Sequence, residues 1–185
     1  GHLAIAQNLL HLDTTVPEFF DVLLHLGTLL AVFVAYWRDI CSMVAELFRG
    51  IGDLVHGTTP ERVPPARRLL LLVILGTLPL FCVLPIHKKI SALGDNMIFV
   101  GAALIFTGIV LLLSDIVGRG NKTERSAGVG SVLLVGFAQA LATLPGVSRS
   151  GMTIAAGCCL GYERRFAVRF SFLLSIPAIL GANLL

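Results

Sequence analysis

The residues best suited to chemistry lie in one short polar stretch, residues 144–153, which reads LPGVSRSGMT. Arg149 stands between Ser148 and Ser150, and Thr153 follows about one helical turn later. A guanidinium group binds phosphate oxygens in pairs, and the free N–H groups at a helix N-terminus also favour anions. The stretch therefore indicates a phosphate-binding site.

The proline and glycines of this stretch break its backbone. Pro145, Gly146 and Gly151 interrupt regular helix, and glycine lets a backbone approach a ligand closely. The pattern is neither a Walker loop nor a G-x-S-x-G elbow, and no strand precedes it. A plainer alternative stays open, in which an arginine between small residues marks a polar loop between two spanning helices.

The segments on either side of this stretch are apolar but short. Neither 129–144 nor 152–160 reaches the roughly 20 residues that a spanning helix needs. Broken backbone and a fixed charge at membrane depth are tolerated only inside the protein or beside a wet cavity. We therefore expect a re-entrant helical hairpin over about 129–160, with the polar stretch at its tip.

The composition of the whole chain is that of a membrane protein. Of its 185 residues, 56% are hydrophobic and 14% are charged, and the mean hydropathy is +0.88. A soluble domain carries about 25% charged residues, so this class is excluded. We predict an all-α polytopic membrane protein with a single membrane domain over 1–185. The spanning helices are predicted at about 19–37, 69–86, 97–117 and 166–185.

The segments between the predicted spanning helices are more polar. Residues 40–49 place apolar and charged side chains on opposite sides of a helix, which predicts an amphipathic surface helix. Residues 50–68 contain Gly, Pro and basic residues and predict a polar loop. Residues 87–95 predict a short loop, and residues 118–127 a charged one.

Basic residues orient these loops relative to the membrane. Loops 38–68 and 118–127 together carry eight Lys and Arg residues, whereas loop 87–95 carries two. Because cytoplasmic loops are enriched in Lys and Arg, the first two are predicted to be cytoplasmic and the third external. Arg164 and Arg165 place the end of the hairpin in the cytoplasm as well, as a re-entrant hairpin requires.

A weak internal repeat relates the two ends of the chain at an offset of 150 residues. It aligns FDVLLHL at 20–26 with FSFLLSI at 170–176. The first of these helices ends at a cytoplasmic loop and the second begins at one, which predicts an inverted-topology repeat with its site at the repeat interface. The offset puts the counterpart of residues 148–150 before Gly1. We therefore expect a chain truncated at both ends and a longer parent protein.

Three segments resemble a known family, the bacterial undecaprenyl-diphosphate phosphatases, also called bacitracin-resistance proteins. Residues 139–153 resemble the second signature of the family, residues 20–32 the helix after its first signature, and residues 170–177 a later helix. The resemblance covers essentially the whole chain. Of the first signature, which is rich in glutamate and serine, only Gly1-His2 is present.

The resemblance implies a reaction and a location. Water would split undecaprenyl diphosphate into the monophosphate and inorganic phosphate, at a site facing outward from the bacterial inner membrane. This would recycle the lipid carrier for peptidoglycan synthesis. The implied partners are a polyprenyl diphosphate lipid and the membrane; a homodimer is left open, and no nucleic acid is expected.

The resemblance also implies roles for individual side chains. Arg149 would hold phosphate oxygens and offset the charge that develops on phosphoryl transfer. Ser148 and His2 would complete the catalytic set, with His2 as base, acid or phosphate ligand; the alternative for His2 is a frayed terminal residue. The substrate-binding residues would be Ser150, Thr153, Gly146, Gly151 and Gln139. A helix–helix contact explains Gln139 equally well.

A divalent cation, Mg²⁺ or Ca²⁺, is implied by the family alone. Its acidic ligands would belong to the first signature and are not in this chain. The four cysteines lack C-x-x-C spacing and predict free thiols, so no metal ligand is assigned to this sequence.

Two other functions stay open at this point. A transporter or flippase of an anionic polyprenyl lipid would also use inverted repeats and broken helices. A structural membrane subunit would not need an arginine at the tip of a hairpin, so tolerance of Arg149→Ala would favour it. Release of phosphate would distinguish an enzyme from a carrier.

Overall fold

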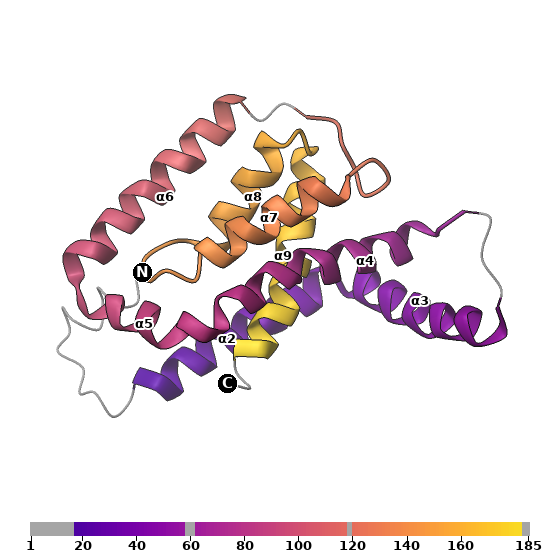
Figure 1. The fold of residues 1–185 in the computed structure, drawn as a ribbon, viewed down its shortest axis with the longest axis horizontal. Coiled ribbons are helices and arrows are strands. Elements are labelled where there is room, and N and C mark those ends of the chain that lie inside the picture. Colours follow the sequence, from indigo (N-terminus) through magenta and orange to yellow (C-terminus); the bar gives the residue numbers. More distant parts are fainter. Residues whose placement is uncertain (1–16, 58–61, 118–119, 183–185) are drawn as a thin grey trace.

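The computed structural model describes residues 17–57, 62–117 and 120–182, and within these ranges the chain is helical with no named strand (Figure 1). The predicted all-α class is confirmed. In chain order the elements are α2 (Pro17–Ala35), α3 (Trp37–His56), α4 (Pro65–Thr77), η1 (Leu78–Cys82), η2 (Leu84–Ile86), α5 (His87–Ser91), η3 (Ala92–Asp95), α6 (Met97–Val117), α7 (Val129–Leu141), α8 (Arg149–Cys159) and α9 (Arg164–Ala182).

Two helical stretches in the described part of the chain are long and apolar enough to cross a membrane. They are Pro65–Ile86, which combines α4 with η1 and η2, and Met97–Ile116 in α6. A third would be the pair formed by Leu26–Ala35 and Trp37–His56, which bends by 84° at Tyr36. The fold is therefore that of a multi-pass membrane protein.

The region between α2 and α4 differs from its prediction. The polar loop predicted over 50–68 is wrong at both ends, because α3 continues to His56 and α4 begins at Pro65. The Arg67 guanidinium holds the two helices together, lying 3.1 Å from Glu46 Oε2 and 2.7 Å from Asp53 Oδ2. Gly57, with φ of +66°, then ends α3 in a left-handed cap.

The segment predicted as a loop over 87–95 is also helical. It consists of the short helix α5 and the 3-10 turn η3, which lead directly into α6. Asn96 stands before α6, and its side-chain oxygen accepts hydrogen bonds from the N–H groups of Ile98 and Phe99. Side-chain capping of this kind satisfies N–H groups that the first turn of a helix leaves free.

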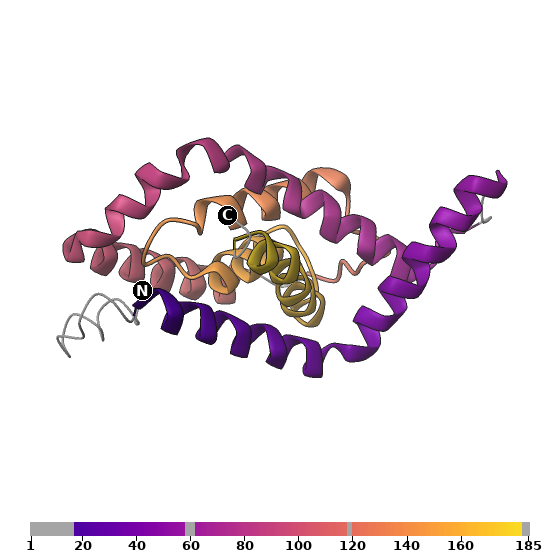
Figure 2. The same cartoon turned by 90° about the horizontal axis from the view of Figure 1, so that it is seen from below.

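Helix α9 occupies the centre of the molecule, with α2 and α4 passing on either side (Figure 2). The rings of Tyr162, Phe166 and Phe170 pack in sequence on its first half and the turn before it. Helices α4 and α7 approach so closely that a Cβ on Gly136 would lie 2.4 Å from the carbonyl oxygen of Gly76. This core holds α7 and α8 in place.

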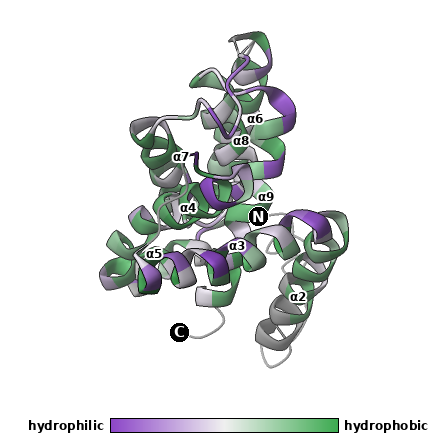
Figure 3. Ribbon diagram, turned by 90° about the vertical axis from the view of Figure 1, so that its right-hand side faces the viewer, coloured by the Kyte–Doolittle hydropathy of each residue, from purple (hydrophilic) through white to green (hydrophobic). Residues whose placement is uncertain are grey.

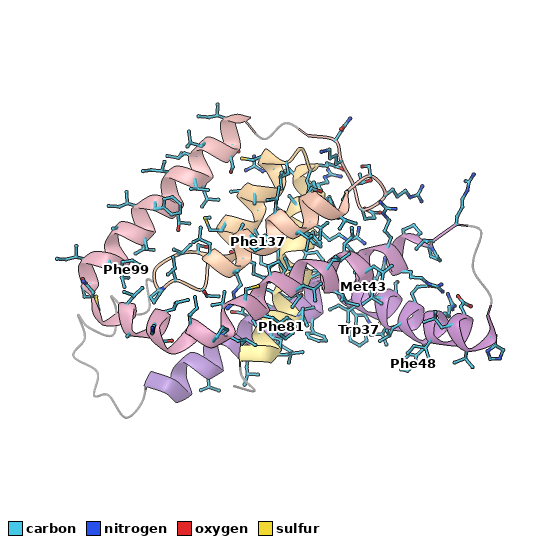
Figure 4. The ribbon with its side chains drawn as sticks, viewed as in Figure 1. Trp37, Met43, Phe48, Phe81, Phe99 and Phe137 are labelled. Carbon is cyan, nitrogen blue, oxygen red and sulfur yellow. The ribbon has the colours of Figure 1, made fainter. Side chains whose placement is uncertain are left out.

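The outer surface is largely apolar, as expected for helices that face lipid. In Figure 3 the hydrophobic colour predominates and hydrophilic segments appear on parts of α3. Phe48, Phe81 and Phe137, labelled in Figure 4, come from α3, η1 and α7 and are 69%, 61% and 55% exposed. Lipid, not water, is the natural environment of such a surface.

The junction between α2 and α3 contacts the first half of α9. The rings of Tyr36 and Phe172 stack with centroids 6.0 Å apart, and Arg169 forms a two-point ion pair with Asp39, at 2.9 and 2.7 Å. The two segments aligned by the repeat lie in α2 and α9, and these two helices also contact each other. The inverted repeat itself stays a prediction.

Candidate active site

Helices α7 and α8 form a hairpin that is too short to cross a membrane in either direction. They contain 13 and 11 residues, which at 1.5 Å per residue gives lengths of about 20 and about 16 Å. The hydrocarbon core of a bilayer is about 30 Å thick. The loop 142–148 joins the two helices and carries the proline and the first glycine of the polar stretch.

The open end of the hairpin is tied to the loop that precedes it. The N–H of Lys122 donates to the carbonyl of Gly161 at 3.0 Å, and the N–H of Glu163 donates back to the carbonyl of Lys122 at 2.8 Å. The hydroxyls of Tyr162 and Ser131 join the two feet of the hairpin at 2.9 Å. Burial raises the pKa of the Tyr162 phenol above its ordinary value, so this group stays neutral near pH 7.

The tip of the hairpin rests against the first turns of α6. Gly146 has φ of +92°, and a Cβ there would lie 2.7 Å from the carbonyl oxygen of Val100 and 2.9 Å from the Cβ of Ala103. Pro145 reaches further, to within 3.6 Å of a Cβ placed on Gly94 in η3. Only glycine fits this approach, since it adopts positive φ freely and has no side chain.

The hairpin accordingly runs along most of the length of α6. Its foot lies beside Asp115, which forms an ion pair with Arg164, and its tip lies beside Val100. These two positions on α6 are separated by about 22 Å at 1.5 Å per residue. The polar tip and the charged foot therefore lie at opposite ends of α6.

Ser148, Arg149 and Ser150 form the first turn of α8, at the tip. Ser148 is the N-cap, and its hydroxyl oxygen accepts a hydrogen bond of 3.2 Å from the N–H of Gly151. The hydroxyl proton of Ser148 stays available to donate. The N–H groups of Arg149 and Ser150 lie in the first turn, where α-helical geometry supplies no partner.

The half-buried Arg149 guanidinium forms no hydrogen bond or ion pair with another side chain in the described part of the protein. Ser150 beside it is exposed. The cation of Arg149, the N–H groups of the first turn and the positive end of the α8 dipole therefore lie on adjacent residues, and no acidic side chain among the described residues pairs with Arg149. Such an arrangement can bind a phosphate group.

Thr153 lies about one turn after Arg149 in α8, Gln139 lies in the last turn of α7, and both are buried. Thr153 is 2% exposed, and its hydroxyl contacts the Arg149 carbonyl at 2.9 Å and the hydroxyl of Ser171 on α9. Gln139 is 0% exposed, and neither of its amide atoms has a hydrogen-bond partner among the described residues. Thr153 thus joins α8 to α9, while Gln139 has unused polar capacity inside the protein.

Two expectations from the sequence concern His2 and a divalent cation. His2 lies outside the described residues. No three His, Cys, Asp or Glu side chains come together within the described residues, so these do not offer a ligand set for the divalent cation implied by the family. Arg149, Ser148 and Ser150 are cationic or hydroxylic and fit the phosphate, not the metal.

Thr107 of α6 contacts the tip directly and was not predicted from the sequence. Its side-chain oxygen accepts a hydrogen bond of 3.3 Å from the N–H of Ser148. Thr107 is 3% exposed and lies in the middle of an apolar helix. A single threonine in such a helix commonly bonds to its own backbone, so its sequence context carried no signal.

Comparison with known proteins gives one consistent family. The family model described as "Bacitracin resistance protein BacA" matches residues 1–185. A protein of Methanosphaera stadtmanae named undecaprenyl-diphosphatase is 39% identical over 191 residues, covering 100% of this chain and 68% of its own length.

Two further relatives carry the same name. That of Desulfosudis oleivorans is 41% identical over 187 residues, and that of Desulforapulum autotrophicum is 39% identical over 190 residues. Each match covers 100% of this chain and 68% of the relative. The polar stretch and the hairpin lie within the matched region, and the chain belongs to the bacitracin resistance protein BacA family.

Proposed function

We propose that this protein hydrolyses undecaprenyl diphosphate to undecaprenyl phosphate and inorganic phosphate. The observation that carries the proposal is the match over the whole chain to relatives named undecaprenyl-diphosphatase, at 39–41% identity. The fold supports it, because a phosphate-binding helix N-terminus lies inside an apolar, multi-pass protein. A lipid diphosphate needs both surroundings, one for its head and one for its chain.

Arg149 is the proposed electrostatic centre of the reaction. In the hydrolysis an O–P bond to water forms and the bridging P–O bond breaks, and negative charge shifts onto the departing lipid phosphate. A guanidinium group can contact two phosphate oxygens at once, and it gains most where the charge increases. Nothing among the described residues competes with the phosphate for Arg149.

The first turn of α8 provides the remaining contacts in this proposal. Ser148 and Ser150 donate hydroxyl protons to phosphate oxygens, and Gly146 and Gly151 let the backbone approach. Gln139 supports the site from within α7, and Thr153 fixes α8 to α9. His2 remains the proposed acid or base, and none of the described residues is assigned as a ligand of the divalent cation.

We further propose that the site opens to the outside of the cell membrane. The foot of the hairpin lies beside loop 120–127 and Arg164, whose basic surroundings favour the cytoplasm. The tip lies about 22 Å further along α6, beside the segment 87–96. The Lys and Arg residues of this segment are Lys88 and Lys89 alone. A tip near the outer end of α6 is reached most directly from outside.

Replacement of Arg149 by lysine tests the chemistry. Lysine keeps the charge but cannot make the planar two-point contact. Arg149→Lys should lower phosphate release from undecaprenyl diphosphate on the order of 100-fold, by analogy with the removal of one preorganised transition-state donor. Arg165→Lys, an exposed change beyond the foot of the hairpin, is the control and should retain activity. Turnover by Arg149→Lys at the rate of Arg165→Lys would refute the role of Arg149.

Cysteine labelling tests the orientation. In a thiol-free variant, single cysteines at 55–57 and 120–125 should react only with reagent supplied from the cytoplasm, and those at 89–94 only from outside. A cysteine at position 148 should react from outside and be protected by added diphosphate lipid. Labelling of position 148 from the cytoplasm alone would contradict an outward-facing site.

A further inference from the structure

The hairpin tip makes one hydrogen bond to α6 through its backbone. The N–H of Ser148 donates to Thr107 Oγ1 at 3.3 Å, and the Thr107 hydroxyl in turn donates to the carbonyl of Ala103 at 2.9 Å. The threonine thus uses its donor within α6 and offers an oxygen lone pair to the loop. Ser148 is the residue immediately before Arg149, so this bond acts next to the guanidinium-bearing residue.

The methyl group of Thr107 adds a second contact at the same place. A Cβ on Gly151 would lie 3.2 Å from Thr107 Cγ2, so the first turn of α8 already packs against this methyl group. Gly146 packs against α6 at Ala103 and Val100, which lie about one and two turns before Thr107. Thr107 therefore contacts the tip through both its hydroxyl oxygen and its methyl group.

We propose that Thr107 is a positioning residue, which holds the first turn of α8 so that Arg149 faces the phosphate. The chemical consequence of this inference rests on the proposed function. The clamp, which is the hydrogen bond from the Ser148 N–H to Thr107 Oγ1, is a property of the loop itself. A buried N–H without an acceptor costs free energy. Removal of the Thr107 oxygen therefore favours loop positions in which the Ser148 N–H bonds to another acceptor. The loop would then sample positions in which Arg149 is misaligned.

The expected effect follows from the net strength of one hydrogen bond. Its loss should shift the equilibrium between the aligned and the misaligned loop about threefold to tenfold toward the misaligned loop. Because the misalignment affects the interaction that grows in the transition state, kcat should decrease and KM should change little.

Two substitutions of Thr107 separate its hydroxyl from its bulk. Thr107→Val keeps the shape and removes the oxygen, whereas Thr107→Ser keeps the oxygen and removes the methyl group. Thr107→Val should lower kcat for phosphate release, by at most about tenfold, and Thr107→Ser should retain most activity. Ser114→Ala is the matched control, since Ser114 is also buried in α6 but donates only to the carbonyl of Leu111, at 2.8 Å.

A second readout reports on the loop without any turnover. In a thiol-free variant, the reaction rate of a cysteine at the half-buried position Val147 should rise, by at most about tenfold, with Thr107→Val and stay unchanged with Ser114→Ala. This rate does not depend on which substrate the protein uses.

The outcomes are distinct. A wild-type protein that releases no phosphate, together with faster labelling in Thr107→Val, would refute the proposed function and support the clamp. An active wild type with unchanged labelling and turnover in Thr107→Val would refute the clamp. Equal losses of kcat in Thr107→Val, Thr107→Ser and Ser114→Ala would assign Thr107 a general packing role. That result would also refute the clamp.

Discussion

Gly146→Ala is the most direct test of the geometry at the hairpin tip. Alanine at this position meets two separate obstacles. The backbone has φ of +92°, which L-residues with a Cβ rarely adopt, and the new methyl group would lie 2.7 Å from the Val100 carbonyl oxygen. Because that oxygen belongs to the backbone of α6, neither partner can rotate out of the way.

The two obstacles can be assigned approximate magnitudes. A left-handed conformation costs an L-residue roughly 1–2 kcal/mol. An extra methyl group in a packed site typically costs about 1–3 kcal/mol. The sum, about 2–5 kcal/mol, can be met either by loss of stability or by retreat of the tip from α6, which would move Arg149.

Thermal unfolding of the purified protein in detergent measures the first response, and phosphate release measures the second. Gly130→Ala is the matched control, since Gly130 lies in the first turn of α7 and a Cβ there has nothing within 4 Å. The control should be neutral or slightly stabilising, because alanine favours helix over glycine. Wild-type stability together with wild-type turnover in Gly146→Ala would refute the close approach of the tip to α6.

Two further predictions concern other parts of the hairpin. Gly120→Ala should destabilise the protein by about 3 kcal/mol or more, because its Cβ would lie 2.0 Å from the Gly161 carbonyl oxygen at the foot; an unchanged unfolding temperature would contradict the backbone pairing there. Gln139→Leu should raise stability by about 1–2 kcal/mol, since it removes a buried amide without partners among the described residues, and should lower phosphate release. A stabilised variant with full activity would show that Gln139 is not part of the site.

The sequence predicted the apolar helices best where composition alone decides. Helix α6 covers Met97–Val117, the range expected from hydropathy, and α7 and α8 lie within the predicted hairpin at 129–160. Hydropathy failed at α3, where Gly50 and the polar residues suggested a loop. There the helix is stabilised by Arg67 on α4, whose partners Glu46 and Asp53 cannot be paired with it from local sequence.

The candidate site was predictable only where its residues are close together in the sequence. Ser148, Arg149 and Ser150 are adjacent in the chain, so a pattern of residue types was enough to bring them together. Thr107 is 41 residues from Ser148, and the contact exists only because Gly146 lets the tip approach α6. Contacts of this kind depend on tertiary packing, which a single sequence does not encode in any local pattern.

The shortness of α7 and α8 also bears on the order in which the protein is assembled. Lipid alone cannot retain two helices of 13 and 11 residues with an arginine between them, because neither covers the hydrocarbon core. Val132 and Val135 of α7 belong to the same core cluster as Phe170 and Leu174 of α9, which leave the ribosome later. We therefore expect the hairpin to remain at the cytoplasmic surface during synthesis and to insert into the bundle only after α9 has been synthesised.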